Sequence, residues 1–298
     1  MTFRTRFAPS PTGPLHLGHA FSAIVGARLA AAAEGVFLLR IEDIDQTRAR
    51  PQWETQIFDD LAWLGLCWPR PVMRQSDRHT AYAAALAELH GQGLLYPCAC
   101  RRRDIVAAAA APQEGAPLHG PDGIVYPGTC RMTPPDPDAA TCFRLDMSKA
   151  LQEIDEITFH EQDHAPSGRV AIPAARMIAE IGDAVIARRE TGTSYHLSVV
   201  VDDAAQEITH VVRGRDLMEA TPLHRLLQRR LGLPEPIYHH HDLIRDETGK
   251  RLAKRDDGCA LSTLRAAGLT PDDICRRIGL EPPVIPLRAA VRPPVRRE

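Results

Sequence analysis

The chain has 298 residues, which suffices for one large domain with an insertion or for two smaller domains. Its composition is that of a globular protein, with 44% hydrophobic and 25% charged residues, and its formal net charge is −2. The net charge therefore excludes binding of a nucleic acid through overall basicity. Binding of a nucleic acid would require a local basic face on the protein.

No uninterrupted apolar run is long enough to span a bilayer, so we expect no contact with a membrane. The seven cysteines are an odd number, and no signal peptide precedes them. This pattern indicates a cytoplasmic protein whose cysteines are thiols or metal ligands rather than disulfides. We also expect a monomer.

The N-terminal stretch predicts a nucleotide site at the first strand-to-helix turn of an α/β sheet. We expect a strand over residues 3–8, a proline-rich loop, and a helix from about Leu15 to Ala33. His16 and His19 then share one face of the first helical turn, where unpaired backbone N–H groups attract phosphates. Gly18 lets a flat base approach the backbone. The alternative is a capped surface helix with two exposed histidines.

Strand-like and helical segments alternate along the chain, which predicts a parallel sheet of the α/β class. The apolar run Val36–Ile41 predicts a buried strand that carries Glu42 to its C-terminal end, where open α/β sheets bind ligands. Further strands are expected at residues 143–146, 157–162, 184–189, 208–213 and 238–241. Helices are expected at residues 51–65, 77–90, 195–203, 217–231, 261–267 and 271–278.

Residues 98–141 are rich in Pro, Gly and Ala without a sustained period, which predicts an inserted, partly irregular region. This region contains Cys98-x-Cys100 and Tyr126-x-x-x-Cys130. Two thiolates two residues apart can share one tetrahedral ion, and Cys130 offers a third. The alternative is a set of buried free cysteines, which are common in protein cores.

A basic loop, KRLAKR, occupies residues 250–255. Of the 36 basic residues only three are lysines, namely Lys149, Lys250 and Lys254. Because arginine serves almost everywhere else, a retained lysine points to a need for a compact ammonium group, as in phosphate binding. The alternative is a solvated charge run. From residue 281 onward the chain is Pro- and Arg-rich, which predicts disorder.

Two segments resemble the signatures of class I aminoacyl-tRNA synthetases. The stretch RFAPSPTGPLHLGH, residues 6–19, resembles the first signature in the form used by glutamyl-tRNA synthetases. The loop KRLAKR stands where that class has Lys-Met-Ser-Lys-Ser, with Arg251 and Ala253 in place of the first Lys and the Ser, and Lys254 as the second Lys. The resemblance covers roughly residues 2–280. It implies a Rossmann-like, dinucleotide-binding parallel sheet with a zinc-containing inserted subdomain and a short helical C-terminal part.

A pocket selective for glutamate needs two cations for the carboxylates and one acid for the ammonium. The segments RFAPS, RIED, YHLSVVVDD and HVVRGRDL match the pocket of glutamyl-tRNA synthetases, which implies that Glu42 binds the ammonium and that Arg6, Arg213 and Tyr195 bind the carboxylates. The implied glutamate-binding set is Arg6, Phe7, Ala8, Pro9, Ser10, Glu42, Tyr195 and Arg213. The implied catalytic residues are His16, His19 and Lys254, and these bind ATP together with Gly18 and Mg²⁺.

Some short relatives of glutamyl-tRNA synthetase carry zinc on Cys-x-Cys and Tyr-x-x-x-Cys at this place. The resemblance therefore implies one structural Zn²⁺ bound by Cys98, Cys100, Tyr126 and Cys130. His119 and Cys142 are the alternatives to Tyr126.

The implied domains are two catalytic halves at residues 1–95 and 183–245, a zinc insertion at 96–182, an ATP loop with a helical remnant at 246–280, and a tail at 281–298. A full-length glutamyl-tRNA synthetase continues into an anticodon-binding domain, whereas about forty residues follow Lys254 here. In this the chain is similar to the glutamyl-Q tRNA(Asp) synthetases. That family activates glutamate with ATP without tRNA and attaches it to queuosine in the anticodon stem-loop of tRNA(Asp).

Two alternatives to that family remain. One is the catalytic subunit of an ordinary glutamyl-tRNA synthetase whose anticodon domain is a separate chain. The other is a non-catalytic paralogue that binds tRNA or glutamate, for which the replacement of the loop serine by Ala253 is the supporting feature.

Overall fold

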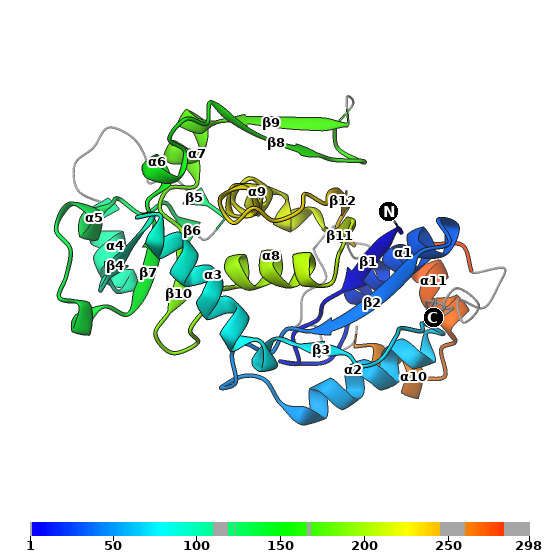
Figure 1. Ribbon diagram of the computed structural model, residues 1–298. Helices are drawn as coiled ribbons and strands as arrows, with labels where there is room; N and C mark the ends of the chain where they lie inside the picture. Colours follow the sequence, from blue (N-terminus) through cyan, green and yellow to red (C-terminus); the bar gives the residue numbers. More distant parts are fainter. Residues whose placement is uncertain (1, 110–118, 122, 166–167, 245–259, 283–298) are drawn as a thin grey trace, which may run out of the picture. The chain divides into compact units, whose positions relative to one another are not determined.

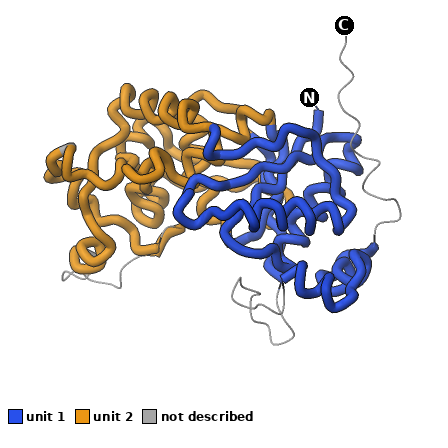
Figure 2. The backbone as a smooth tube through the Cα atoms, turned by 90° about the horizontal axis from the view of Figure 1, so that it is seen from below, with its two compact units in different colours: residues 1–77, 208–216, 236–298 blue, residues 78–207, 217–235 orange. Residues whose placement is uncertain are grey.

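The computed structural model describes residues 2–109, 119–121, 123–165, 168–244 and 260–282 (Figure 1). The chain forms two compact units (Figure 2). Unit 1 contains residues 1–77, 208–216 and 236–298, and unit 2 contains residues 78–207 and 217–235. The basic loop with Lys254 and the tail from residue 283 lie outside the described residues. The domain boundaries expected from the sequence stay a prediction.

Unit 1 is built on parallel strands. In the first sheet β1 (Arg4–Phe7), β2 (Val36–Ile41) and β3 (Met73–Arg74) lie side by side in that order. A second parallel pair consists of β11 (His210–Gly214) and β12 (Ile237–His241). The Thr209 amide donates to the Arg4 carbonyl oxygen at 3.0 Å, so β11 begins next to β1. The predicted parallel arrangement is therefore confirmed for these segments.

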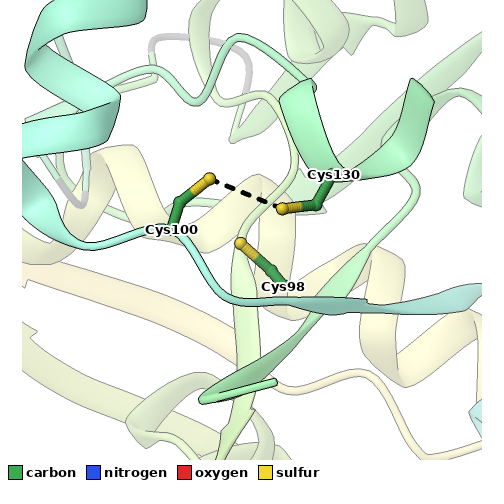
Figure 3. Close-up of side chains that lie close together, drawn as sticks. All are labelled: Cys98, Cys100 and Cys130. Carbon is green, nitrogen blue, oxygen red and sulfur yellow. Dashed lines mark hydrogen bonds between the residues drawn. The ribbon is translucent and has the colours of Figure 1, made fainter. Parts of the chain in front are cut away.

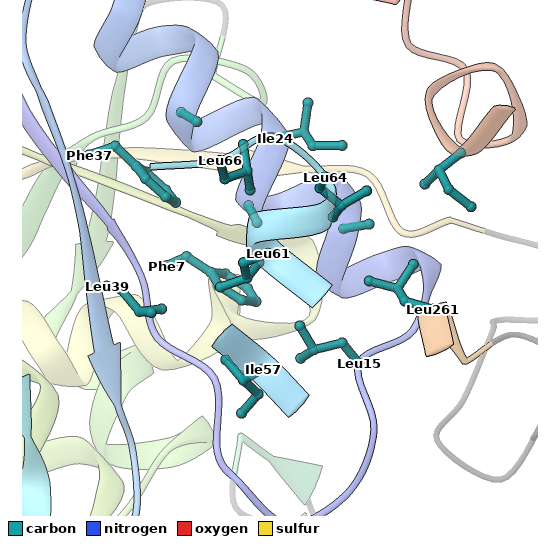
Figure 4. Packing of buried hydrophobic residues seen from close by; sticks show 14 of the residues in the cluster. Phe7, Leu15, Ile24, Phe37, Leu39, Ile57, Leu61, Leu64, Leu66 and Leu261 are labelled. Atoms are coloured by element: carbon teal, nitrogen blue, oxygen red, sulfur yellow. The ribbon is translucent and has the colours of Figure 1, made fainter. Parts of the chain in front are cut away.

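The helices of unit 1 bury one apolar core against these strands. They are α1 (Leu17–Ala32), α2 (Pro51–Trp63), α10 (Leu261–Ala266) and α11 (Pro271–Arg277). Pro51 stands at the first turn of α2, where its missing N–H costs no hydrogen bond. Figure 4 shows Phe7 and Leu39 from the strands packed with Ile57 and Leu61 from α2. This burial of apolar side chains fixes the strand ends that carry the polar residues of the candidate site.

Unit 2 contains an antiparallel sheet in the order β10 (Val185–Arg188), β7 (Cys142–Leu145), β4 (Leu95–Cys98). A two-stranded hairpin is formed by β8 (Glu156–His160) and β9 (Arg169–Pro173), and a short one by β5 (His119–Gly120) and β6 (Gly123–Ile124). The longer helices are α3 (His79–Gly91), α8 (Tyr195–Ala205) and α9 (Thr221–Arg230). The shorter ones are α4 (Arg102–Ala109), α5 (Thr129–Met132), α6 (Met147–Ala150) and α7 (Ala174–Glu180).

The strand expected at residues 184–189 exists, but its predicted parallel pairing is wrong. It forms β10, which pairs antiparallel with β7. Side chains alternate in the same way in parallel and antiparallel strands, so the pattern of one strand does not reveal the direction of its neighbour. The order of strands and helices along the chain therefore predicts a parallel sheet where the local pairing is antiparallel.

None of the helices in the described part of the chain combines the length and the apolar character that crossing a membrane requires.

Candidate functional site

His16 and His19 are held at the start of α1 by their own backbone. The His16 ring accepts a hydrogen bond from the Gly18 amide at Nδ1 (3.1 Å), and the His16 amide donates to His19 Nδ1 at 3.2 Å. The two rings are stacked with centroids 3.8 Å apart, and both residues are half-buried. Because each Nδ1 accepts a bond, each neutral ring carries its proton on Nε2, which is a donor suited to a phosphate oxygen.

Gly18 lies between the two histidines, where a side chain would disturb this arrangement. A Cβ at this position would lie 3.1 Å from His16 Cε1 and 3.2 Å from His16 Nδ1. Glycine therefore lets the His16 ring fold back over the first turn of the helix. This packing is a reason for glycine at position 18 in addition to the predicted approach of a flat base.

Arg6 and Arg213 come from the neighbouring strands β1 and β11, and they are 5% and 6% exposed. Arg6 Nη1 donates to the carbonyl oxygen of Val212 at 3.4 Å, directly before Arg213. Arg213 Nε donates to His240 Nε2 at 3.0 Å. The structure thus brings together, at the C-terminal ends of parallel strands, two buried cations that can attract carboxylates.

Glu42 directly follows β2 and is tied to the loop after β1, because its amide donates to the Pro9 carbonyl oxygen at 3.0 Å. One carboxylate oxygen, Oε1, accepts from Arg40 Nη2 at 3.0 Å, and Arg40 is fully buried. Loop residues 8–10, which belong to the predicted set, therefore lie beside the ends of β1 and β2. Arg40 belongs to none of the residue sets predicted from the sequence, although an arginine inside the apolar run VFLLRI indicates a buried charge.

The described part of unit 1 includes neither of the two other predicted members, Tyr195 and Lys254. Tyr195 belongs to unit 2, where it begins α8 after the capping residue Ser194 and packs its ring edge-on against His224, with centroids 5.7 Å apart. Lys254 lies outside the described residues. Their roles in binding glutamate and ATP stay predictions.

The three predicted cysteine ligands do converge in unit 2 (Figure 3). Cys98 ends β4, Cys100 follows two residues later, and Cys130 belongs to α5. Their Sγ atoms all lie within 4.8 Å of one another, and those of Cys100 and Cys130 are 3.4 Å apart. Thiolates around a tetrahedral zinc ion are about 3.8 Å apart, given Zn–S bonds of about 2.3 Å.

The Tyr126 hydroxyl group lies beside the cysteine cluster. Its oxygen lies 3.5 Å from Cys98 Sγ and 3.4 Å from Cys100 Sγ, and it accepts from the Cys130 amide at 2.8 Å. Among the described residues, neither His119 nor Cys142 belongs to the group of converging ligand atoms. The geometry therefore favours Tyr126 over the two alternatives.

The thiols of this cluster differ in their tendency to ionise. Hydrogen bonds with the Cys142 thiol, the Tyr126 hydroxyl and the Arg144 guanidinium lower the pKa of Cys98 to about 4. Burial raises the pKa of Cys100 to about 11. These contacts favour the thiolate form of Cys98, which is the form that binds metals.

Comparison with known proteins assigns this chain and its fold to one class. The model of the family "tRNA synthetases class I (E and Q), catalytic domain" matches residues 2–120 and 140–282. The chain is 26% identical to the crystal structure of a glutamate tRNA ligase from Elizabethkingia meningosepticum in complex with its amino acid, with a TM-score of 0.68 over 86% of this chain. It covers 52% of that ligase, so it spans about half the length of this neighbour.

Two curated relatives narrow the class further. A glutamyl-Q tRNA(Asp) synthetase of Rhodobacter capsulatus is 61% identical over 280 residues, which are 93% of this chain and 99% of the relative. A protein of the same name from Symbiobacterium thermophilum is 39% identical over 97% of this chain and 89% of its own length. The chain therefore belongs to the glutamyl-Q tRNA(Asp) synthetase family of class I synthetases, and the resemblance seen in its sequence is confirmed.

Proposed function

We propose that this protein activates L-glutamate with ATP, independently of tRNA, and transfers the glutamyl group to queuosine in the anticodon stem-loop of tRNA(Asp). The observation that carries the proposal is the 61% identity to a glutamyl-Q tRNA(Asp) synthetase over nearly the whole of that relative. The candidate site of unit 1 supports the chemistry of the first step, because it contains buried cations and one acid at the strand ends and two histidines at the start of α1.

In the proposed complex the charges of unit 1 match those of glutamate, which carries two carboxylates and one ammonium. Arg6 and Arg213 bind the carboxylates through charge-assisted hydrogen bonds. Glu42 accepts the ammonium, and Arg40 holds its carboxylate in place at 3.0 Å. Phe7 ends β1, and Ala8, Pro9 and Ser10 form the following loop, which lies against the substrate.

For activation, the α-carboxylate of glutamate attacks the α-phosphate of ATP in line, and pyrophosphate leaves. The chain forms no covalent bond to the substrate, so its contribution is positioning and charge stabilisation. His16 and His19 donate from Nε2 to the phosphates, and Lys254 adds a point charge. Gly18 leaves the backbone open beside the base. Mg²⁺ bound with ATP supplies further positive charge.

For transfer, a cyclopentene hydroxyl of queuosine attacks the carbonyl carbon of glutamyl-adenylate. An ester bond forms, the bond between the carbonyl carbon and the phosphate oxygen breaks, and AMP leaves. The hydroxyl proton passes to solvent.

We expect purified protein to catalyse glutamate-dependent ATP–pyrophosphate exchange without any tRNA. The measurement compares the exchange rate with and without tRNA at saturating ATP. Exchange that strictly requires tRNA would favour an ordinary glutamyl-tRNA synthetase subunit. Absence of exchange under both conditions would contradict an enzyme and favour the non-catalytic paralogue. The buried side chains of Arg6 and Arg213 and the largely covered side chain of Glu42 favour the enzyme.

Unit 2 is proposed to bind one structural zinc ion. Cys98, Cys100 and Cys130 would bind it as thiolates, and Tyr126 would be the fourth ligand. All four positions would then be filled by protein, as in structural rather than catalytic sites. The bound ion would give the irregular region around α4 and α5 a fixed centre.

We expect elemental analysis to find about one zinc per chain. Cys98→Ser should lose the metal and loosen the region around α5, while adenylate formation by the residues of unit 1 largely survives. Cys67→Ser is the matched control, because Cys67 is a free cysteine of unit 1 and should not affect zinc content. A native protein without metal would contradict the proposed site.

A further inference from the structure

Arg144 is a buried arginine that contacts two of the proposed metal ligands. It lies in β7, the central strand of the antiparallel sheet, and is 7% exposed. Its Nε donates to Cys98 Sγ at 3.3 Å, and its guanidinium carbon lies 3.8 Å from the centroid of the Tyr126 ring. The same side chain donates from Nη1 to the Asp183 carbonyl oxygen at 2.8 Å. Three contacts thus fix the guanidinium from different sides.

A guanidinium buried to this degree needs an anionic partner, because removing a charge from water without compensation is costly. In the described part of the chain no carboxylate forms an ion pair with Arg144. Asp183 contributes only its main-chain oxygen, since its carboxylate accepts from Tyr96, Arg131 and the Met147 amide. The partner of the Arg144 charge is therefore the cysteine cluster.

The cysteine cluster with a bound metal ion would also need a compensating charge. Three thiolates around a divalent ion leave a net charge of about −1, and that charge would lie in a mostly buried cluster where Cys98 and Cys130 are hardly exposed. A fixed cation beside Cys98 balances this excess. Carboxylate, carbonyl and other partners outside the ligand set commonly change metal affinity 10–100-fold in this way.

We propose that Arg144 is the charge-compensating and positioning residue of the metal site: it neutralises the cluster, orients Cys98 and packs against the ring of Tyr126. This inference rests on the proposed zinc site of unit 2. It assigns to Arg144 the retention of the ion rather than any contact with glutamate, ATP or RNA.

The test measures how fast zinc passes from the purified, zinc-loaded protein to an excess of a coloured chelator. Arg144→Met should release zinc at least about tenfold faster than the unchanged protein. Arg144→Lys keeps the positive charge but loses the planar guanidinium, which donates to both Cys98 and Asp183. Its zinc release rate should therefore lie between those of the unchanged protein and Arg144→Met. With cobalt in place of zinc, Arg144→Met should show a weaker sulfur-to-cobalt charge-transfer band, because Cys98 is no longer oriented.

Arg131→Met is the matched control. Arg131 also bonds the carboxylate of Asp183, but no hydrogen bond or ring contact joins it to Cys98 or Tyr126. It should release zinc at nearly the unchanged rate and keep the cobalt spectrum. Equal acceleration in Arg131→Met and Arg144→Met, or an unchanged rate in Arg144→Met, would overturn the inference while the zinc site stands. A protein that never binds zinc would instead refute the site itself.

If Arg144→Met does not fold, Arg144→Lys alone decides. A release rate above that of the unchanged protein supports the inference, and an unchanged rate overturns it.

Discussion

Replacing Arg213 by methionine should lower kcat/KM for glutamate in ATP–pyrophosphate exchange by about 10²-fold or more, with little change in KM for ATP. Truncating one partner of a buried, hydrogen-bonded charge pair costs about 2–5 kcal/mol, and about 1.4 kcal/mol corresponds to a factor of ten. Arg213 is nearly fully buried and fixed by His240, so water cannot replace its charge at the substrate carboxylate. The measurement varies glutamate at saturating ATP.

Arg215→Met is the matched control for Arg213. Arg215 follows two residues later, is largely exposed, and lies 3.6 Å from Asp242 in a surface ion pair. Such surface ion pairs contribute little to stability, so kcat/KM for glutamate of this variant should remain close to that of the unchanged protein. A similar loss in both variants would show a general defect of the β11 end, and full activity of Arg213→Met would contradict a carboxylate-binding role.

Lys254→Ala should lower kcat by about 10²-fold or more, because removing one preorganised charge from a transition state has an effect of that size. Lys254→Arg should also be impaired, since a guanidinium does not reproduce the compact ammonium group at a phosphate. Both variants are measured by single-turnover formation of glutamyl-adenylate, which separates the chemical step from binding.

Lys149→Arg is the control for the exchange of lysine by arginine as such. Lys149 belongs to α6, is mostly exposed, and pairs with Asp146 at 3.8 Å. This variant should be fully active. If Lys254→Arg is equally active, the scarcity of lysine in the sequence does not mark a phosphate-binding residue.

The sequence predicts the convergence of the three cysteines better than it predicts the sheet of unit 2. Cys98 and Cys100 are two residues apart, and Tyr126 and Cys130 are four residues apart, so the members of each pair must lie close together. The strand β4 has no comparable signal, because Pro97 interrupts its pattern. A proline is tolerated there because, among the strands of the described residues, β4 lies at the edge of its sheet and pairs with β7 alone.

The site of unit 1 is predictable where a residue has a motif around it. Arg6 and His16 belong to the motif RFAPSPTGPLHLGH, which predicts the end of a strand and the start of a helix. Glu42 directly follows the apolar run VFLLRI, which predicts the end of another strand. Arg40 was missed because an arginine inside an apolar run does not by itself name the group that balances its charge, which in the structure is the carboxylate of Glu42. The parallel pairing in unit 1 follows from chain order, whereas β10 shows that the same order is compatible with an antiparallel neighbour.

The central claim is that the activated glutamate goes to queuosine and not to the end of a tRNA. The most direct measurement incubates the protein with ATP, labelled glutamate and tRNA(Asp) from cells with or without queuosine, and maps the label after nuclease digestion. We predict labelling of queuosine-containing tRNA(Asp) in the anticodon stem-loop and none at the 3′ end of tRNA(Glu). Labelling that persists without queuosine, or that maps to a 3′-terminal adenosine, would contradict the proposed function.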